Sequence, residues 1–214
     1  FNSLLEKTLW MEDRLHQISQ NQWQELTSKD GKLIAMQEDW YGHIPEMVAW
    51  QIELEKKGWS FSKAEKDVEF FLQLQTGDML KIYGRVDRID SNDEGSLLVL
   101  DYKYKNGNAL SKLKKMIWDD PQILIYSKAI SLLHQQRGNR VHDAAWVSLG
   151  EADSDKRDLS IPVNSEQMEA LDEKLLADLN PIWMGEVMPA NGITKTCSYC
   201  DARGICRKGM WHGE

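Results

Sequence analysis

Asp87, Asp101 and Lys103 lie at the ends of two apolar runs in the stretch from Tyr83 to Gly107. Asp87 comes near the close of the first run, whereas Asp101 and Lys103 come at the close of the second. Side chains alternate along a β-strand, so Asp101 and Lys103 project from the same side of the second run. The turn between the runs is rich in Asp, Asn, Glu and Gly, and antiparallel pairing through it would bring Asp87 close to Asp101.

Two carboxylates that converge beside an apolar core repel each other, and both stay ionised only if a cation holds them together. Mg²⁺, or Mn²⁺ in its place, is the natural candidate, because Mg²⁺ is bound by one or two carboxylates together with waters and phosphate oxygens. Such an ion activates a water and stabilises the transition state of phosphoryl transfer. We therefore expect Asp87 and Asp101 to bind the metal and Lys103 to orient the attacking water or neutralise charge on the phosphate.

Three predicted strands position these residues. Alternating and β-branched patterns predict strands over 59–75, 78–90 and 96–105, with a hairpin turn at Thr76-Gly77-Asp78. A further strand is predicted over 143–150, and a weaker one over 157–163 is placed at a sheet edge by its proline.

Helical periodicity and capping residues surround these strands. The apolar spacing in residues 1–18 predicts a long N-terminal helix, which the segment 28–33 breaks. Further predicted helices cover residues 43–58, 109–118, 119–136 and 164–179. The segment 191–211 has no periodicity and contains all three cysteines. The pattern indicates one α/β domain, in which 1–58 is a helical part, 59–183 the core and 184–214 a cysteine-bearing tail.

Composition narrows the class of protein. The chain of 214 residues is long enough for one domain with a full hydrophobic core. Its net charge of −8 argues against non-specific coating of duplex nucleic acid, although a local cleft can still be basic or loaded with metal. We expect no membrane segment and a reducing cytoplasm, because no apolar stretch is long enough to span a bilayer and the cysteines form no disulfide framework. The start at Phe1 rather than Met leads us to expect the C-terminal fragment of a longer protein.

The motifs resemble those of the PD-(D/E)xK nuclease superfamily and, more narrowly, its RecB/AddB-type nuclease domains. In that type a G-x-x-D-R-I-D strand precedes a D-Y-K-x-G strand, and a helix bearing Q-x-x-x-Y follows. The same order occurs here as Asp87, then Asp101 with Lys103, then Gln122 with Tyr126. Gln122 and Tyr126 are four residues apart and therefore share one helix face.

The resemblance implies a restriction-endonuclease-like core, a central mixed sheet flanked by helices. It also implies Mg²⁺-dependent hydrolysis of DNA, by an exonuclease of double-strand-break repair or recombination that works with a helicase subunit or domain. Gln122 and Tyr126 would position DNA, or pack the helix on the sheet. A strand upstream carries a Glu in the family, here Glu65, as a further metal contact; Glu69 is the alternative, and both could be exposed strand charges.

Two features of the family are incomplete in this chain. The family has a metal-site histidine in an N-terminal G-x-x-x-H pattern, but neither His16 nor His43 follows a glycine in that spacing. We expect the motif to lie upstream of the fragment, with His16 as the alternative. If it is absent, a catalytically inactive DNA-binding or scaffolding module in a helicase–nuclease complex becomes the rival function.

The second incomplete feature is the cysteine cluster of the tail. The C-x2-C-x5-C run formed by Cys197, Cys200 and Cys206 resembles the family's ligands for a [4Fe–4S] cluster, which needs a fourth cysteine upstream. Zinc, with His212 or an Asp as the fourth ligand, and a tail of three reduced thiols are the alternatives. A domain in which a cysteine-bound metal mediates interactions is therefore a second rival.

A basic run follows the D-Y-K strand at Lys112, Lys114 and Lys115. Such a run is most often a solvated helix face. Its closeness to the predicted site makes contact with phosphate the competing interpretation.

Overall fold

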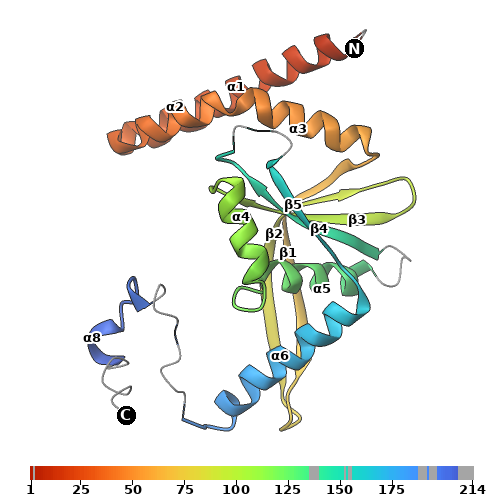
Figure 1. The fold of residues 1–214 in the computed structure, drawn as a ribbon, viewed down its shortest axis with the longest axis vertical. Helices are drawn as coiled ribbons and strands as arrows, with labels where there is room; N and C mark the ends of the chain where they lie inside the picture. The colour runs from red at the N-terminus through yellow and green to blue at the C-terminus, as the bar shows by residue number, and fades with distance from the viewer. Residues whose placement is uncertain are drawn as a thin grey trace. The chain divides into compact units, whose positions relative to one another are not determined.

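The described residues form a five-stranded sheet (Figure 1). The structure is a computed structural model that describes residues 1, 3–134, 140–151, 153, 156–187, 192 and 197–206. In order along the sheet, its strands are β1 Ser60–Gln73, β2 Met79–Ser91, β3 Ser96–Lys103, β4 Arg140–Ser148 and β5 Asp158–Pro162.

The sheet is mixed, because its neighbouring strands run in both senses. β2 pairs antiparallel with β3, β3 runs parallel to β4, and β4 pairs antiparallel with β5. The parallel pair needs a crossover, which is provided by the helices between β3 and β4. β5 ends at Pro162 on the edge of the sheet, where the missing backbone donor costs no ladder bond.

Helices precede the sheet, cross over it and follow it. They are α1 Leu4–Lys29, the 3₁₀ turn η1 Gly31–Leu33, α2 Ile34–Gly42, α3 Ile44–Lys56, α4 Gly107–Lys115, α5 Gln122–His134, α6 Ser165–Trp183 and α8 Arg203–Cys206. Ser3 caps α1 by accepting from the backbone N–H of Glu6 at 3.1 Å, and Pro45 lies in the first turn of α3, where its missing N–H is tolerated.

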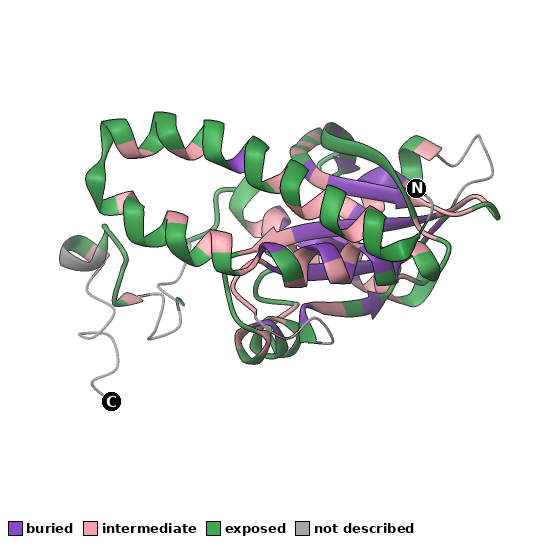
Figure 2. Cartoon of the chain, turned by 90° about the horizontal axis from the view of Figure 1, so that it is seen from above, coloured by how far each residue is buried: buried purple, intermediate pink, exposed green. Residues whose placement is uncertain are grey.

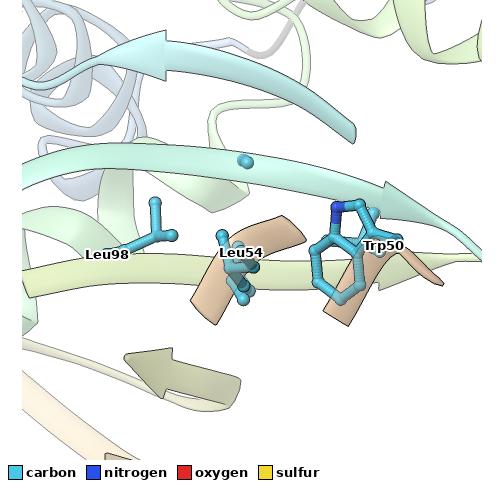
Figure 3. Close-up of a cluster of buried hydrophobic side chains, with 6 residues drawn as sticks. Trp50, Leu54 and Leu98 are labelled. Atoms are coloured by element: carbon cyan, nitrogen blue, oxygen red, sulfur yellow. The ribbon is translucent and has the colours of Figure 1, made fainter. Parts of the chain in front are cut away.

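Two helices cover opposite faces of the central strands. Trp50 and Leu54 of α3 pack on Leu98 and Leu100 of β3, which point to one side (Figure 3). The alternate residues of β3 point to the other side, where α5 packs on β3 and β4. Buried residues are therefore concentrated on the strands (Figure 2).

The described residues separate into two compact units. The first comprises residues 1–72 and 81–171 and holds the core of the sheet. The second comprises residues 73–80 and 172–214, in which the backbone N–H of Gln75 donates to Asn180 at 3.0 Å and the indole of Trp183 donates to Asp78 at 2.8 Å.

The predicted fold class is confirmed: an α/β fold with a mixed central sheet, flanking helices and a helical N-terminal part. α1 ends at Lys29, within the segment 28–33 that is predicted to break the long N-terminal helix. The sequence interpretation missed α2, a helix of nine residues in which no residue is buried, so it lacks a clear apolar stripe. Within the described part of the chain, no helix combines the length and apolar character that crossing a bilayer requires.

Candidate active site

The pairing of β2 with β3 brings the two aspartates together. Arg88 pairs with Leu100, so the next pair along the same register is Asp87 with Asp101. Residues that face each other directly across an antiparallel pair have Cβ atoms about 4.5–5.5 Å apart. The backbone N–H of Tyr102 donates to Oδ2 of Asp87 at 2.8 Å, which fixes that carboxylate beside the end of β3.

Asp101 is almost fully buried, at 2% exposure, and has one close cation. The Lys103 ammonium lies 2.8 Å from its Oδ2, as expected for residues i and i+2 on one face of a strand. Burial raises the pKa of Asp101 above the usual value; Lys103 lowers it in part, and the negative charges of Asp87 and Asp120 raise it further. The site therefore concentrates negative charge that a single lysine does not neutralise.

The N-terminal part of α5 contacts Lys103. Lys103 Nζ donates to Oε1 of Gln122 at 2.8 Å, and the Gln122 amide donates to the Tyr126 hydroxyl at 3.1 Å. The Tyr126 ring lies against the backbone of β2 at Gly84, where an added Cβ would come within 2.9 Å of its Cε1. Only glycine allows this close approach without a shift of the ring.

The donors at this site fit a hard divalent cation. Oδ2 of Asp101 is buried, and its one described partner is the Lys103 ammonium at 2.8 Å. A carboxylate oxygen keeps further acceptor capacity beside one ammonium group, so it can also serve as a metal ligand. The described residues include no group of three or more His, Cys, Asp or Glu side chains arranged around one metal position. Two carboxylates are nevertheless sufficient for Mg²⁺, which keeps several waters and uses phosphate oxygens of its substrate.

The opposite face of the same strand pair holds a second charged cluster, which is satisfied internally. The Arg88 guanidinium donates to both carboxylate oxygens of Asp90, at 2.6 and 2.7 Å, and to the Tyr102 hydroxyl at 3.2 Å. It also lies 5.8 Å from the ring centre of Trp50 and 5.7 Å from that of Phe61. Burial lowers the pKa of Arg88, but its contacts with Asp90 and Tyr102 outweigh this and raise it overall.

The structure does not bring the predicted Glu65 to the two aspartates through any contact it describes. Glu65 is exposed on β1, interacts electrostatically with Arg85, and has a φ of +47°. That backbone conformation is uncommon for a residue other than glycine and marks an irregularity in the strand. Its alternative, Glu69, is paired with Lys81 at 2.5 Å. A metal contact at Glu65 stays a prediction.

The histidine and cysteine candidates lie in other surroundings. His16 is exposed and stacks on Tyr41, with ring centres 4.6 Å apart. Cys197, Cys200 and Cys206 are free thiols, half-buried, exposed and half-buried respectively. His212, the zinc alternative, is outside the residues that the structure describes.

Sequence reasoning missed two parts of this region. One is Asp120, whose negative charge raises the pKa of Asp101. The other is the buried ion pair of Arg88 with Asp90, which is not among the sequence predictions. The signal for it was an alternation in which Arg88 and Asp90 share the face of the apolar Leu98 and Leu100, a pattern that places charge inside only if it is paired.

Comparison with known proteins identifies the family of this chain. The chain is similar to a solved structure titled "Crystal structure of SSO0001", with 18% identity and a TM-score of 0.44 over 92% of this chain and 81% of that chain. That level of likeness carries no argument about function. No curated protein matches the chain at a significant level. The family model of the PD-(D/E)XK nuclease superfamily matches residues 2–207. The chain therefore belongs to the PD-(D/E)XK nuclease superfamily.

Proposed function

We propose that this chain is a Mg²⁺-dependent deoxyribonuclease, an exonuclease of the RecB/AddB type that acts with a helicase partner in double-strand-break repair or recombination. The observation that carries the proposal is the cluster of Asp87, Asp101 and Lys103 at one end of the β2–β3 pair, with Gln122 bound to the lysine. Family membership supports the nuclease chemistry, and the order of the motifs supports the narrower type.

In this proposal Asp87 and Asp101 hold the divalent ion, which when bound supplies charge neutralisation and an activated water. The buried carboxyl of Asp101 must lose its proton to serve as a ligand, and Lys103 favours the ionised form. Lys103 is held between Asp101 and Gln122, so its ammonium has a fixed direction. A fixed donor stabilises charge developing on a phosphate oxygen better than a mobile one, because no reorganisation is needed during reaction.

Gln122 and Tyr126 act as positioning residues in this account. Gln122 accepts from Lys103 and donates to Tyr126, so the three side chains form one chain of hydrogen bonds from β3 to α5. Among the described residues, the tail cysteines form no group of three or more metal-holding side chains, and the proposed roles of Asp87, Asp101 and Lys103 do not depend on them.

The test is cleavage of end-labelled single- and double-stranded DNA by the purified chain in Mg²⁺, Mn²⁺ or EDTA. We expect metal-dependent release of short products, and loss of this activity in Asp101→Asn and Asp87→Asn. Asp67→Asn is the matched control, because Asp67 is an exposed carboxylate on β1 that pairs with Arg85 at 2.8 Å. Equal cleavage by Asp101→Asn and the wild type would contradict the proposal.

A second candidate, a non-catalytic DNA-binding or scaffolding module, is favoured by one observation. The N-terminal His16 stacks on Tyr41 in an exposed position and makes no described contact with the two aspartates. DNA binding by the wild-type chain with no cleavage in either metal would support this candidate over the nuclease.

A further inference from the structure

The segment from Tyr102 to Trp118 is strongly basic. It contains no Asp or Glu in a protein whose net charge is −8, and its lysines are Lys103, Lys105, Lys112, Lys114 and Lys115. Many lysines elsewhere are paired with carboxylates, namely Lys7, Lys29, Lys56, Lys81 and Lys174. By contrast, no described carboxylate forms an ion pair with the three lysines of α4, so their charge is available to an external anion.

The segment leaves the site and returns to it. β3 ends at Lys103, α5 begins at Gln122, and the side chains of these two residues are joined by a hydrogen bond of 2.8 Å. Between them α4 has nine residues, which at 1.5 Å per residue is about 14 Å of helix. Lys114 of this helix contacts Ser160, which is two strands away from Leu100 of β3 in the sheet register. At about 4.8 Å between strands and 3.3 Å per residue, α4 lies within roughly 20 Å of Lys103, or about six steps of duplex DNA at 3.4 Å per step.

The orientation of α4 is fixed by contacts at its start and on its inner side. Asn106 caps the helix by accepting from the N–H of Ala109 at 3.0 Å, and the N–H of Gly107 donates to Glu151 at 2.8 Å. Leu110 is fully buried, and the helix packs on β4 and β5. Because this side is covered, the lysines on the other sides of α4 point into solvent.

Two of these lysines share one exposed face. Lys112 and Lys115 are both exposed and three residues apart, a spacing that places side chains next to each other on a helix. Lys114 is exposed as well but donates to the carbonyl of Ser160 at 3.3 Å, which holds its ammonium near β5. Lysines in the last turn also interact favourably with the helix dipole. That interaction needs only one cation and does not require the lysines to share a helix face.

We propose that the exposed face of α4, with Lys112 and Lys115 at its centre, binds backbone phosphates of the DNA strand that enters the active site. This rests on the proposed function, because it names where the substrate of that same site lies. The occupant follows from charge complementarity. Two neighbouring ammonium groups, on a helix held against the sheet near a phosphodiester-cleaving site, match the regular charges of a nucleic-acid backbone.

The test compares the double variant Lys112→Gln/Lys115→Gln with Lys56→Gln/Lys57→Gln. The control removes the same charge from the end of α3, another helix whose last turn is basic and exposed. Affinity for a fluorescent 30-mer duplex is measured in EDTA, so that no cleavage occurs, over a range of KCl concentrations. Thermal melting of each variant confirms that it is folded.

The expected result is a smaller salt dependence in the α4 variant alone. Each lost phosphate contact lowers the slope of log K against log salt by about 0.9 for duplex DNA, so the double variant should lose about 1.8. In cleavage assays with Mg²⁺, KM should rise while kcat is unchanged, because the lost contact is uniform binding.

An unchanged salt slope in the α4 variant, or an equal change in the control, would overturn this proposal. Absence of salt-dependent DNA binding by the wild-type chain would overturn it as well. The outcome is separable from that of the proposed function. If the wild-type chain cleaves DNA but the salt slope of the α4 variant is unchanged, only the α4 proposal is wrong. If the α4 variant has a reduced slope but the wild-type chain cleaves DNA in no metal, the proposed nuclease function is wrong and the α4 proposal stands.

Discussion

The two faces of the β2–β3 pair carry the same kinds of side chain in opposite states. On the α5 face, Asp87 and Asp101 converge, and the one described cation close to the buried Asp101 is Lys103. On the α3 face, both oxygens of Asp90 accept hydrogen bonds from Arg88. Successive residues of one strand thus alternate between a carboxylate available to a ligand and an ion pair closed within the protein.

The difference between the two faces indicates which cluster serves activity and which serves stability. Two converging carboxylates that share one lysine destabilise the folded chain, because the buried one is desolvated and the two charges repel, and such a pair persists where a cation completes it. A buried ion pair with its hydrogen bonds complete tolerates desolvation, and loss of one partner leaves an isolated charge inside. We therefore expect substitutions on the α5 face to change activity and those on the α3 face to change stability.

The largest expected effect is on cleavage, and it comes from Asp101→Asn. Loss of a metal ligand removes several kcal/mol of transition-state stabilisation, so the single-turnover rate should fall by about 10³-fold or more. In EDTA the free energy of unfolding of Asp101→Asn should equal or exceed that of the wild type, because the variant removes a buried ionisable group. A variant that loses both cleavage and most of its stability would break the contrast between the two faces.

The matching substitution on the other face is Asp90→Asn. It leaves the Arg88 cation buried without its carboxylate, which typically costs about 3–5 kcal/mol of the free energy of unfolding. Urea unfolding measures this loss, and cleavage per folded molecule should fall far less than in Asp101→Asn. Asp67→Asn breaks an exposed pair with Arg85 and is expected to have little effect on unfolding.

A stability change near zero in Asp90→Asn would show that the pair contributes nothing net, contrary to this account. Arg88→Lys sharpens the same point. Lysine keeps the charge but loses the two parallel hydrogen bonds to Asp90 and the planar group beside Trp50, so part of the stability should be lost.

The pH dependence of stability gives a smaller but specific signal. The pKa of Asp101 is raised by burial, so the folded metal-free protein retains a proton that the unfolded chain releases. The stability from this proton is fully present below the ordinary value of 3.8 and is lost as pH rises through the raised pKa. Asp101→Asn lacks this component.

Urea unfolding of both proteins in EDTA, at a series of pH values above 4, measures the component as a difference. We expect the wild type to lose stability relative to Asp101→Asn as pH rises. Saturating Mg²⁺ should oppose this loss if it binds the ionised carboxylate. A difference that is independent of pH would mean that Asp101 is not desolvated in the folded chain.

Much of the α5 face could be predicted from the sequence, because it follows from local rules. The period of two in a strand puts Asp101 and Lys103 on one side, and four-residue spacing puts Gln122 and Tyr126 on one helix face. The turn after β2 then fixes the antiparallel pairing that brings Asp87 opposite.

The α3 face could not be predicted in the same way. Charged residues in a strand normally indicate its solvent side, and only the tertiary contacts of Arg88 with Asp90, Tyr102 and Trp50 make a buried charge acceptable. The proximity of Asp120 to Asp101 is also tertiary, since it depends on how the crossover returns to the sheet.

The smallest expected effect tests how tightly α5 is seated on β2. Gly84→Ala would place a Cβ within 2.9 Å of Tyr126 Cε1, so the ring must shift and move its hydrogen bond with Gln122. Gln122 in turn holds Lys103, and a displacement of this kind should lower the cleavage rate by about tenfold or less. The unfolding free energy should fall by about 1–3 kcal/mol through overpacking.

A double-mutant cycle decides whether that loss passes through the ring. If Tyr126 transmits the effect, adding Gly84→Ala to Tyr126→Ala should cost nothing further, because the clash is gone. If the two losses add instead, Gly84 acts through the backbone of β2 and thus through the position of Asp87. Either result shows whether the Tyr126 ring or the β2 backbone carries the effect to the site. No loss of cleavage rate in Gly84→Ala would mean that the Lys103–Gln122–Tyr126 chain of hydrogen bonds is not needed to position the lysine.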